Sequence, residues 1–298
     1  MALGAAAVGA IAGIAYARSE AASYRLRRVN VPAPSAGGSL RILHLSDLHM
    51  TPRRRRLRDW VSGLASLAPD YVVVTGDFLA HPDAIRPALE ALGPLRDAPG
   101  AFVLGSNDYF APRPINPLQY FAGPSDVDPR RQELPWPDLV APLEESGWAH
   151  LANTDTSLVV RGMSLHVRGV DDPHIGRDDY APVAGRAEAD LTLGIAHAPY
   201  LRVINAMAAD GVDVMLAGHT HGGQVRVPGV GALVTNCDLP PSRARGMSSY
   251  PRPTLRTPVG AASDRQMWLH VSAGLGTSPY APLRFACPPE ATLITVGG

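Results

Sequence analysis

Residues 215–224 read MLAGHTHGGQ, so an apolar run ends abruptly in two histidines that are set between glycines. His219 and His221 are separated by a single residue. Two imidazoles in such a place are more typical of ligands than of side chains that fill a core, because neutral imidazole is the commonest metal ligand in proteins. The stretch therefore predicts a strand that delivers ligands to a site, provided that other residues meet them there.

Short apolar runs that end in possible ligands recur along the chain. We expect strands over residues 40–46, 71–76, 101–105, 191–197 and 212–218, and helices over 57–68, 83–97 and 199–210. The possible ligands at the strand ends are Asp47, His49, Asp77, Asn107, Asp108, His197, His219 and His221. Because open α/β sheets place their sites at the carboxyl ends of their strands, we expect these side chains to converge.

Each of these residues, taken alone, has a structural explanation. Asp77 or Asn107 could cap a helix, and Asp47 could shape a turn. His197 could be a hydrogen-bonded histidine of the core. None of these explanations accounts for histidine and acidic residues at the same end of successive strands, so the combined pattern favours a metal site.

The overall composition is that of an ordinary globular protein. The chain has 298 residues, of which 46% are hydrophobic and 18% charged, and its 27 basic and 27 acidic residues balance. A net charge of zero gives no electrostatic reason to expect a nucleic-acid partner. The only two cysteines, Cys237 and Cys287, do not make a disulfide scaffold. Function is therefore expected to come from a local site.

The N-terminal region is expected to be separate from the domain that carries the possible ligands. Residues 1–30 form an apolar segment, which is either an anchor or a helix that packs on the domain or lies at a membrane surface. Residues 31–39 read as a linker, and residues 40–298 as one domain with a proline-rich insertion at about 110–137. Arginines follow the apolar part, which favours the cytoplasm or the cytoplasmic face of a membrane. The sequence AYA at 15–17 leaves an exported form open.

The order of the motifs resembles that of the calcineurin-like metallophosphoesterases. The blocks are D-x-H at 47–49, G-D at 76–77, G-S-N-D at 105–108, a single His197 and G-H-T-H at 218–221. Within that family, GHTHGGQ and the tail VSAGLGTSPYAPLRFACPPEATLITV at 271–296 are similar to a bacterial branch of small, often membrane-associated phosphodiesterases. The resemblance implies a four-layer α/β/β/α sandwich of two mixed sheets, with a dinuclear site at the strand ends.

The resemblance also implies which residues hold the metals. The first metal would be bound by Asp47, His49 and His221, the second by Asn107, His197 and His219, and Asp77 would bridge the two. Carboxylate, imidazole and amide donors suit Mn²⁺, Fe²⁺ or Zn²⁺, and the lack of clustered cysteines argues against a structural zinc site. Two such ions ~3.5–4 Å apart can generate a bridging hydroxide and stabilise an in-line phosphoryl displacement.

One block departs from the family pattern, which is G-N-H-[DE]. Here Gly105, Ser106, Asn107 and Asp108 stand instead, so the histidine that would contact phosphate is missing. We expect Asn107 rather than Ser106 to bind the metal and to lie against the substrate, because an amide oxygen is the better ligand. Asp108 would then face the phosphate, where an ionised carboxylate repels dianions more than diesters.

The expected function is metal-dependent hydrolysis of phosphodiester or pyrophosphate-type bonds in a small-molecule or lipid-linked substrate. We assign catalysis to Asp77, Asp108 and His219. Arg53 and Arg54, in TPRRRRLRD, are either solvated surface or a site that attracts phosphate or anionic lipid. The alternatives are a phosphomonoesterase, including a protein phosphatase, and a catalytically silent module that only binds metal.

Overall fold

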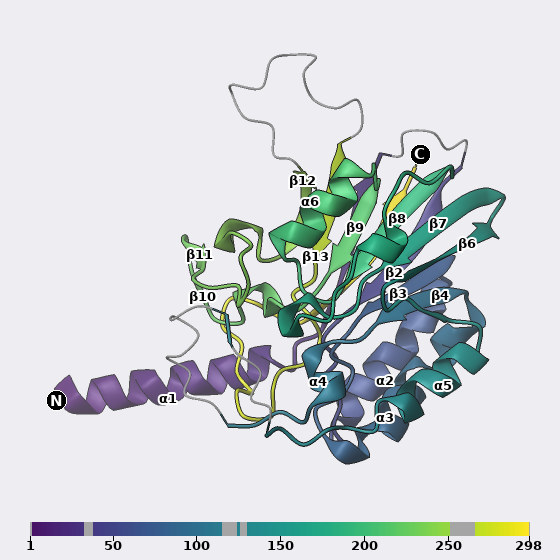
Figure 1. Ribbon diagram of the computed structural model, residues 1–298. Coiled ribbons are helices and arrows are strands. Elements are labelled where there is room, and N and C mark those ends of the chain that lie inside the picture. Colours follow the sequence, from purple (N-terminus) through teal and green to yellow (C-terminus); the bar gives the residue numbers. More distant parts are fainter. Residues whose placement is uncertain (1, 33–37, 115–123, 126–129, 251–265, 298) are drawn as a thin grey trace, which may run out of the picture.

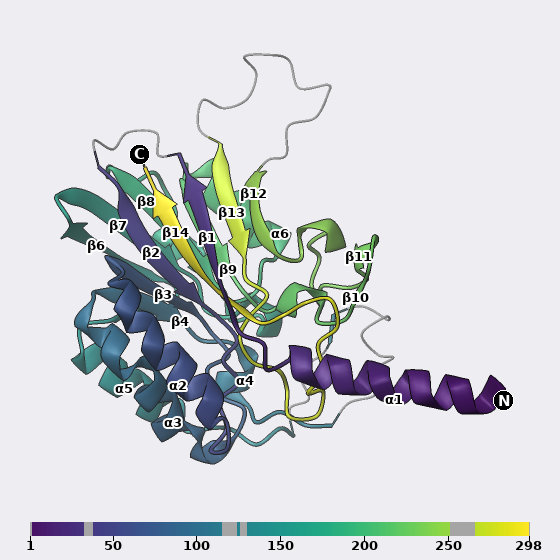
Figure 2. The same cartoon turned by 180° about the vertical axis from the view of Figure 1, so that it is seen from behind.

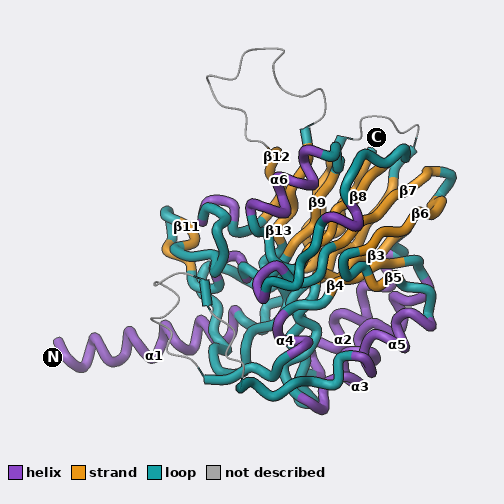
Figure 3. The backbone as a smooth tube through the Cα atoms, viewed as in Figure 1, coloured by secondary structure: helices purple, strands orange, loops and turns teal. Residues whose placement is uncertain are grey.

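Two six-stranded sheets pack face to face, and helices cover their outer faces (Figures 1 and 3). The computed structural model describes residues 2–32, 38–114, 124–125, 130–250 and 266–297. Parts of the expected linker and of the proline-rich insertion lie outside these residues. The expected α/β architecture of two mixed sheets flanked by helices is confirmed.

The first sheet carries the amino-terminal half of the catalytic motifs. Its strands, in spatial order, are β1 (Arg25–Val31), β14 (Glu290–Val296), β2 (Leu40–Leu45), β3 (Tyr71–Thr75), β4 (Gly100–Val103) and β5 (Ala149–His150). Strands β2 to β5 are parallel, whereas β14 runs antiparallel to β2. The outer face is covered by α2 (Arg55–Gly63), α3 (Ile85–Leu92) and α5 (Pro137–Glu145).

The second sheet carries the histidine loops. Its spatial order is β12 (Gly246–Tyr250), β13 (Met267–Val271), β9 (Val214–Ala217), β8 (Leu191–Ala196), β7 (Met163–Gly169) and β6 (Thr154–Val160). Helix α6 (Leu201–Ala209) covers its outer face. The remaining elements are α1 (Ala2–Glu20), α4 (Ser106–Tyr109) and a small hairpin of β10 (Arg226–Val227) and β11 (Gly231–Ala232). Short 3-10 turns extend several helices, including Leu64–Leu67 and Gly93–Asp97.

Side chains that alternate between the two faces of each strand divide the core into layers. In β2, Ile42 lies between the two sheets, whereas Leu43 and Leu45 pack beneath the outer helices. Successive side chains of a strand point to opposite faces, so a strand that is covered on both sides is largely apolar, as YVVVT of β3 shows. The five strands predicted from apolar runs are all present, each within two residues of its expected ends.

Residues 25–31 have a place in the first sheet. Strand β1 pairs with β14 along its whole length, from Arg25 opposite Glu290 to Val31 opposite Val296. The end of α1 also contacts the tail, because the Arg284 backbone N–H donates to Ala17 O at 3.0 Å and the Cys287 N–H donates to the Glu20 carboxylate at 3.2 Å. In the described residues, no helix has both the length and the apolar character needed to cross a membrane.

These contacts predict different effects for two truncations. We expect deletion of residues 1–10 to leave stability unchanged. Deletion of residues 1–30 should lower the melting temperature by about 5–10 °C, because the β1 ladder and the half-buried Leu26 and Val29 contribute several kcal/mol. Thermal unfolding of both truncated forms tests this. Equal melting temperatures would show that β1 adds nothing to the sheet.

Candidate metal centre

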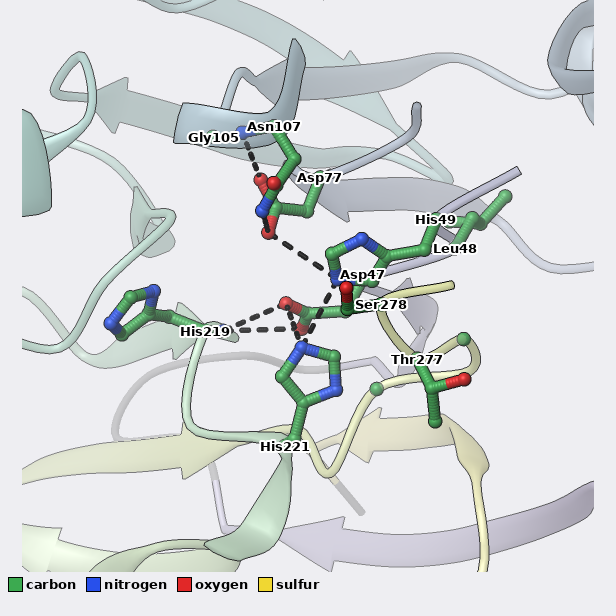
Figure 4. A network of polar contacts seen from close by, with 12 residues as sticks. Asp47, Leu48, His49, Asp77, Gly105, Asn107, His219, His221, Thr277 and Ser278 are labelled. Atoms are coloured by element: carbon green, nitrogen blue, oxygen red, sulfur yellow. Dashed lines mark hydrogen bonds and ion pairs between the residues drawn. The ribbon is translucent and has the colours of Figure 1, made fainter. Parts of the chain in front are cut away.

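All the expected ligands lie at the carboxyl ends of strands from both sheets. Asp47 and His49 follow β2, Asp77 follows β3, and Asn107 lies in α4 beyond β4. The remaining three come from the second sheet, His197 after β8 and His219 and His221 after β9. The parallel strands of each sheet point the same way, so their ends bring these loops together at one edge (Figure 4).

Backbone strain is concentrated in these loops. Of the eleven described non-glycine residues with positive φ, five are expected ligands, namely Asp47, His49, Asp77, His219 and His221, with φ between 44° and 67°. The left-handed region is unfavourable for residues with a Cβ, and such strain persists where the surrounding structure over-determines it. These sharp turns bring side chains that are two residues apart, such as Asp47 and His49, toward the same site. Strained backbone of this kind is often found at functional sites.

Four side chains converge into a cluster that can hold a metal ion: Asp47, His49, Asp77 and His221. One ligand atom from each lies within 4.8 Å of the others. The Nε2 atom of His49 is 3.1 Å from Nε2 of His221 and 3.4 Å from Asp77 Oδ2, and His221 Nε2 is 3.5 Å from Asp47 Oδ1 (Figure 4). These are the expected ligands of the first metal together with the expected bridge.

The Asp77 carboxylate also faces the residues expected at the second metal. Its Oδ2 atom lies 3.6 Å from His197 Nε2 and accepts a hydrogen bond from the Asn107 amide at 2.7 Å. The Asn107 oxygen instead accepts from Arg131 at 3.0 Å, so ligation through that oxygen requires the amide to turn. The His219 ring lies beside His197, with centroids 5.2 Å apart, and points away from the cluster of four (Figure 4).

One ring nitrogen of His197 and one of His219 form hydrogen bonds that leave the other nitrogen available for a metal. His197 Nδ1 lies 2.7 Å from Thr75 O, and His219 Nε2 lies 3.0 Å from Asn236 O. A carbonyl only accepts, so each of these nitrogens carries the proton, and in the neutral ring the other nitrogen keeps its lone pair. Metal-binding histidines are usually oriented in this way. His197 Nε2 is buried and has no hydrogen-bond partner, as expected of a ligand atom.

The electrostatics of the site also favour a cation. Burial raises the pKa of Asp47 to about 6. Burial lowers the pKa of His197, but Asp77, Asp172 and Asp47 more than offset this and raise it to about 9. Burial also opposes ionisation of Asp77, yet His197 and His49 hold its pKa below the ordinary value. These carboxylates attract positive charge into a buried place, which a divalent ion would supply.

Two glycines allow the loops to approach this closely. A Cβ on Gly105 would lie 2.4 Å from Asp77 Oδ1, and one on Gly218 would lie 1.8 Å from the Ser46 hydroxyl. Neither distance is possible for a real side chain. Gly105 and Gly218 therefore bring neighbouring backbone against the carboxylates of Asp77 and Asp47, as expected for glycines beside ligands.

Asp108 was expected to face the phosphate, but its side chain points into the protein. Its side chain is fully buried, and its two oxygens accept the backbone N–H groups of Leu79 and Gly105, each at 2.9 Å. Burial, and then the charge of Asp77, raises its pKa to about 8. Because both oxygens are used within the protein, Asp108 fixes the loop between β4 and α4 and does not face the substrate.

The neighbouring arginines Arg53 and Arg54 have different environments. Arg53 is exposed. Arg54 is half-buried, and its guanidinium donates to Thr277 O at 2.6 Å and to the Thr277 hydroxyl at 3.1 Å. Burial lowers the pKa of Arg54 to about 10. Arg54 therefore ties the turn that follows Asp47 to the tail loop at 274–277, which is a positioning role rather than contact with substrate.

This difference predicts that the two arginines respond differently to substitution. Arg54→Gln should destabilise the fold by about 1–3 kcal/mol, since the two oxygens of Thr277 lose a charged, partly buried donor. Arg53→Gln, the matched control, should leave the free energy of unfolding unchanged and raise KM if Arg53 attracts the substrate. Denaturant unfolding and steady-state kinetics measure both. Equal stability of the two variants would contradict the positioning role of Arg54.

Sequence reasoning missed several polar residues beside the site. Arg284 is fully buried and donates to Gly274 O and Gly276 O at 3.1 and 2.7 Å. The His174 ring lies 4.4 Å from that of His219, and Oδ2 of buried Asp172 has no hydrogen-bond partner. Asp172 and His174 sit in a loop beyond β7, a strand that was not expected. The available signal was the alternation of apolar and polar residues in MSLHVRG at 163–169, which is typical of a strand.

Comparison with known proteins agrees with the site. The family model described as calcineurin-like phosphoesterase matches residues 40–223. The chain is 28% identical over 215 residues to a transmembrane protein with a metallophosphoesterase domain from Bos taurus, covering 70% of this chain and 47% of that one. It is 27% identical to the UDP-2,3-diacylglucosamine pyrophosphatase LpxG of Chlamydia trachomatis over an alignment 299 positions long, gaps included, which covers 86% of this chain and 83% of that one. The chain thus spans about half of the first relative's length.

Solved structures show similarity at low sequence identity. The TT1561 protein of Thermus thermophilus matches with a TM-score of 0.40 at 15% identity, covering 80% of this chain and 91% of that one. The strand-end cluster and the family match together define a metal-dependent phosphoesterase. The chain belongs to the calcineurin-like phosphoesterase family.

Proposed function

We propose that the chain hydrolyses phosphodiester or pyrophosphate-type bonds with two divalent metal ions. The first would be held by Asp47, His49, Asp77 and His221, and the second by Asp77, Asn107, His197 and His219. The observation that carries this proposal is the position of Asp77 Oδ2, which faces His49 on one side and His197 and Asn107 on the other. A carboxylate in that place can serve two ions at once.

The protein contributes orientation and enclosure. When bound, the two ions supply a hydroxide nucleophile at neutral pH and neutralise the charge on the transferred phosphoryl group. The backbone carbonyls of Thr75 and Asn236 fix the histidine tautomers. The N–H of Asn107 donates to Asp77 Oδ1 at 2.9 Å and so restrains the orientation of the carboxylate. Such positioning contributes to the reaction rate, because a small displacement of a catalytic group can lower the rate strongly.

The loop at 105–108 favours substrates with a stable leaving group. It contains no histidine, and the Asp108 carboxyl is occupied by backbone N–H groups, so this loop offers no general acid. General-acid catalysis typically contributes ~10²–10⁴-fold, which matters most for alkoxide leaving groups. We therefore favour diesters with acidic leaving groups and pyrophosphate bonds, whose leaving groups need no proton.

The relatives support a lipid-linked nucleotide as one such substrate. LpxG, which aligns with most of this chain, is named as a pyrophosphatase of UDP-2,3-diacylglucosamine. Such a substrate carries a pyrophosphate bond next to an acyl-bearing sugar. The arginines after the apolar N-terminal stretch support a location at the cytoplasmic face of a membrane.

Two chromogenic esters test the proposed reaction. With Mn²⁺, the purified protein should hydrolyse bis-p-nitrophenyl phosphate faster than p-nitrophenyl phosphate, and a chelator should abolish both activities. Faster hydrolysis of the monoester would favour a phosphomonoesterase instead. Metal binding without hydrolysis of either ester would indicate a silent metal-binding module and would overturn the proposal.

A further inference from the structure

Exposed apolar side chains gather at one end of the molecule. Among the described residues, nine large apolar side chains are exposed, and eight of them belong to α1, the β10–β11 region and the tail loop. The ninth, Val159, lies on β6 at the far edge of the second sheet. Soluble proteins rarely leave such groups clustered, and large exposed patches usually mark an interaction site.

The three segments form one continuous surface, which we call the apolar end. The Tyr16 ring of α1 packs edge to face on Phe285, with centroids 5.3 Å apart. Phe285 in turn forms a parallel bridge opposite Val225, in which its N–H donates to Gln224 O and its carbonyl accepts from the Arg226 N–H. The Gln224 side-chain amide donates to Ala281 O at 2.7 Å, next to Tyr280. Figures 1 and 2 show α1 leaving the body on the side where β10 and β11 lie.

The apolar end adjoins the metal centre. Val225 follows the ligand His221 by four residues, and the Arg226 guanidinium donates to Gly222 O at 2.8 Å. Arg284, which neighbours Phe285, reaches His221 Nδ1 at 3.3 Å. Whatever covers the apolar end is therefore brought to the edge of the catalytic loops.

The exposed part of α1 has no single polar side. Ile11, Ile14 and Tyr16 are all exposed, and at 100° per residue Tyr16 projects from nearly the opposite side of the helix to Ile14. No charged residue occurs between residues 2 and 17. A helix that is apolar all round belongs in a core or in lipid, because a partner that offers a single flat face would leave part of it in water.

The three segments of the apolar end carry charges of one sign, and the nearby carboxylate of Glu20 is buried between α1 and the tail. Residues 2–19, 221–237 and 271–289 contain no aspartate or glutamate, but they contain Arg18, Arg226 and Arg284. Of these, Arg18 is exposed and Arg226 is half-buried, so both can meet a ligand. Anionic lipid headgroups attract arginines that flank an apolar surface.

We propose that the apolar end docks into a lipid surface that carries anionic headgroups. The hairpin side chains Val227 and Val230 would enter the acyl boundary beside α1, and Arg18 and Arg226 would lie at headgroup level. The metal centre then opens toward substrates that are anchored in the same surface, a consequence that rests on the proposed function.

Co-sedimentation of the full chain with vesicles tests the docking. The chain should bind phosphatidylcholine vesicles that contain phosphatidylglycerol more tightly than pure phosphatidylcholine vesicles. The double variant V227D/V230D should bind at least about tenfold more weakly, since two exposed valines that would enter the acyl boundary are replaced by charges. V159D is the matched control, because Val159 is 72% exposed and Val230 73%, and it should bind like the unaltered chain.

Further measurements separate the possible outcomes. Ile14→Gln, on α1, should also weaken vesicle binding, and each protein should keep its melting temperature and its hydrolysis of bis-p-nitrophenyl phosphate in solution. Unaltered binding by V227D/V230D and Ile14→Gln, or no binding by the unaltered chain, would overturn the proposal. A dimer in sedimentation equilibrium that V227D/V230D dissolves, without vesicle binding, would assign the surface to a second copy. Inactivity of the unaltered chain on the ester would count against the proposed function alone.

Discussion

Asp77→Ala should lose both metal ions and hydrolysis together. Asp77 faces both groups of ligands through one carboxylate oxygen, so its removal cannot affect one site alone. Loss of the metals removes several kcal/mol of transition-state stabilisation, which corresponds to a decrease in kcat/KM of about 10³-fold or more. Metal analysis of the purified variant and kinetics with bis-p-nitrophenyl phosphate measure the two effects.

The variant should remain folded, which keeps this result interpretable. Removing the carboxylate relieves its repulsion with Asp47 but also removes the hydrogen bonds from Asn107 and the attraction to His197 and His49, so we expect the metal-free variant to melt lower than the metal-free unaltered chain and still to unfold in one cooperative transition. Asp83→Ala is a suitable control, because Asp83 is exposed in the turn that follows Asp77. Two equivalents of tightly bound metal in Asp77→Ala would show that Asp77 is not the shared ligand.

Asn107→Ala should strip the second metal and retain the first. The Asn107 side chain is the one in its loop that reaches Asp77, and its amide must turn so that the oxygen meets a metal. We expect about one equivalent of bound metal and a loss of activity of at least about 10²-fold, because a single ion cannot stabilise both the attacking and the leaving oxygen.

Ser106→Ala provides the matched control in the same loop. Ser106 is almost fully buried, and a hydroxyl is a poorer ligand than an amide oxygen for these metals. Its metal content and kcat/KM should stay close to those of the unaltered chain. If Ser106→Ala loses the metal and Asn107→Ala does not, then Ser106 is the ligand in the block at 105–108, and the assignment of Asn107 is wrong.

The fold and the ligand loops could be predicted from the sequence because two signals coincide there. Apolar runs mark the buried strands, and histidine or acidic residues directly after them mark the edge where those strands end. Asp47, His49, Asp77 and His221 meet at that edge, as expected. The positive φ angles of these residues could not be predicted, since they follow from the packing of the loops against each other.

Other features depend on contacts that no local pattern reports. The four arginines at 53–56 are alike in sequence, and only the position of Thr277 distinguishes Arg54. Strand β1 was expected to be part of an N-terminal segment and a linker, because its partner β14 lies more than 250 residues away in the chain. Asp108 is a different case, since a carboxylate three residues after Gly105 is a recognisable capping pattern.

The most direct test of the two-metal account is a titration of the metal-free protein with Mn²⁺, in which hydrolysis of bis-p-nitrophenyl phosphate is followed against bound metal. Because Asp77 would join the two ions into one catalytic unit, we predict that the second equivalent restores most of the activity and that a third adds nothing. Full activity with one equivalent bound, or with none, would contradict the account.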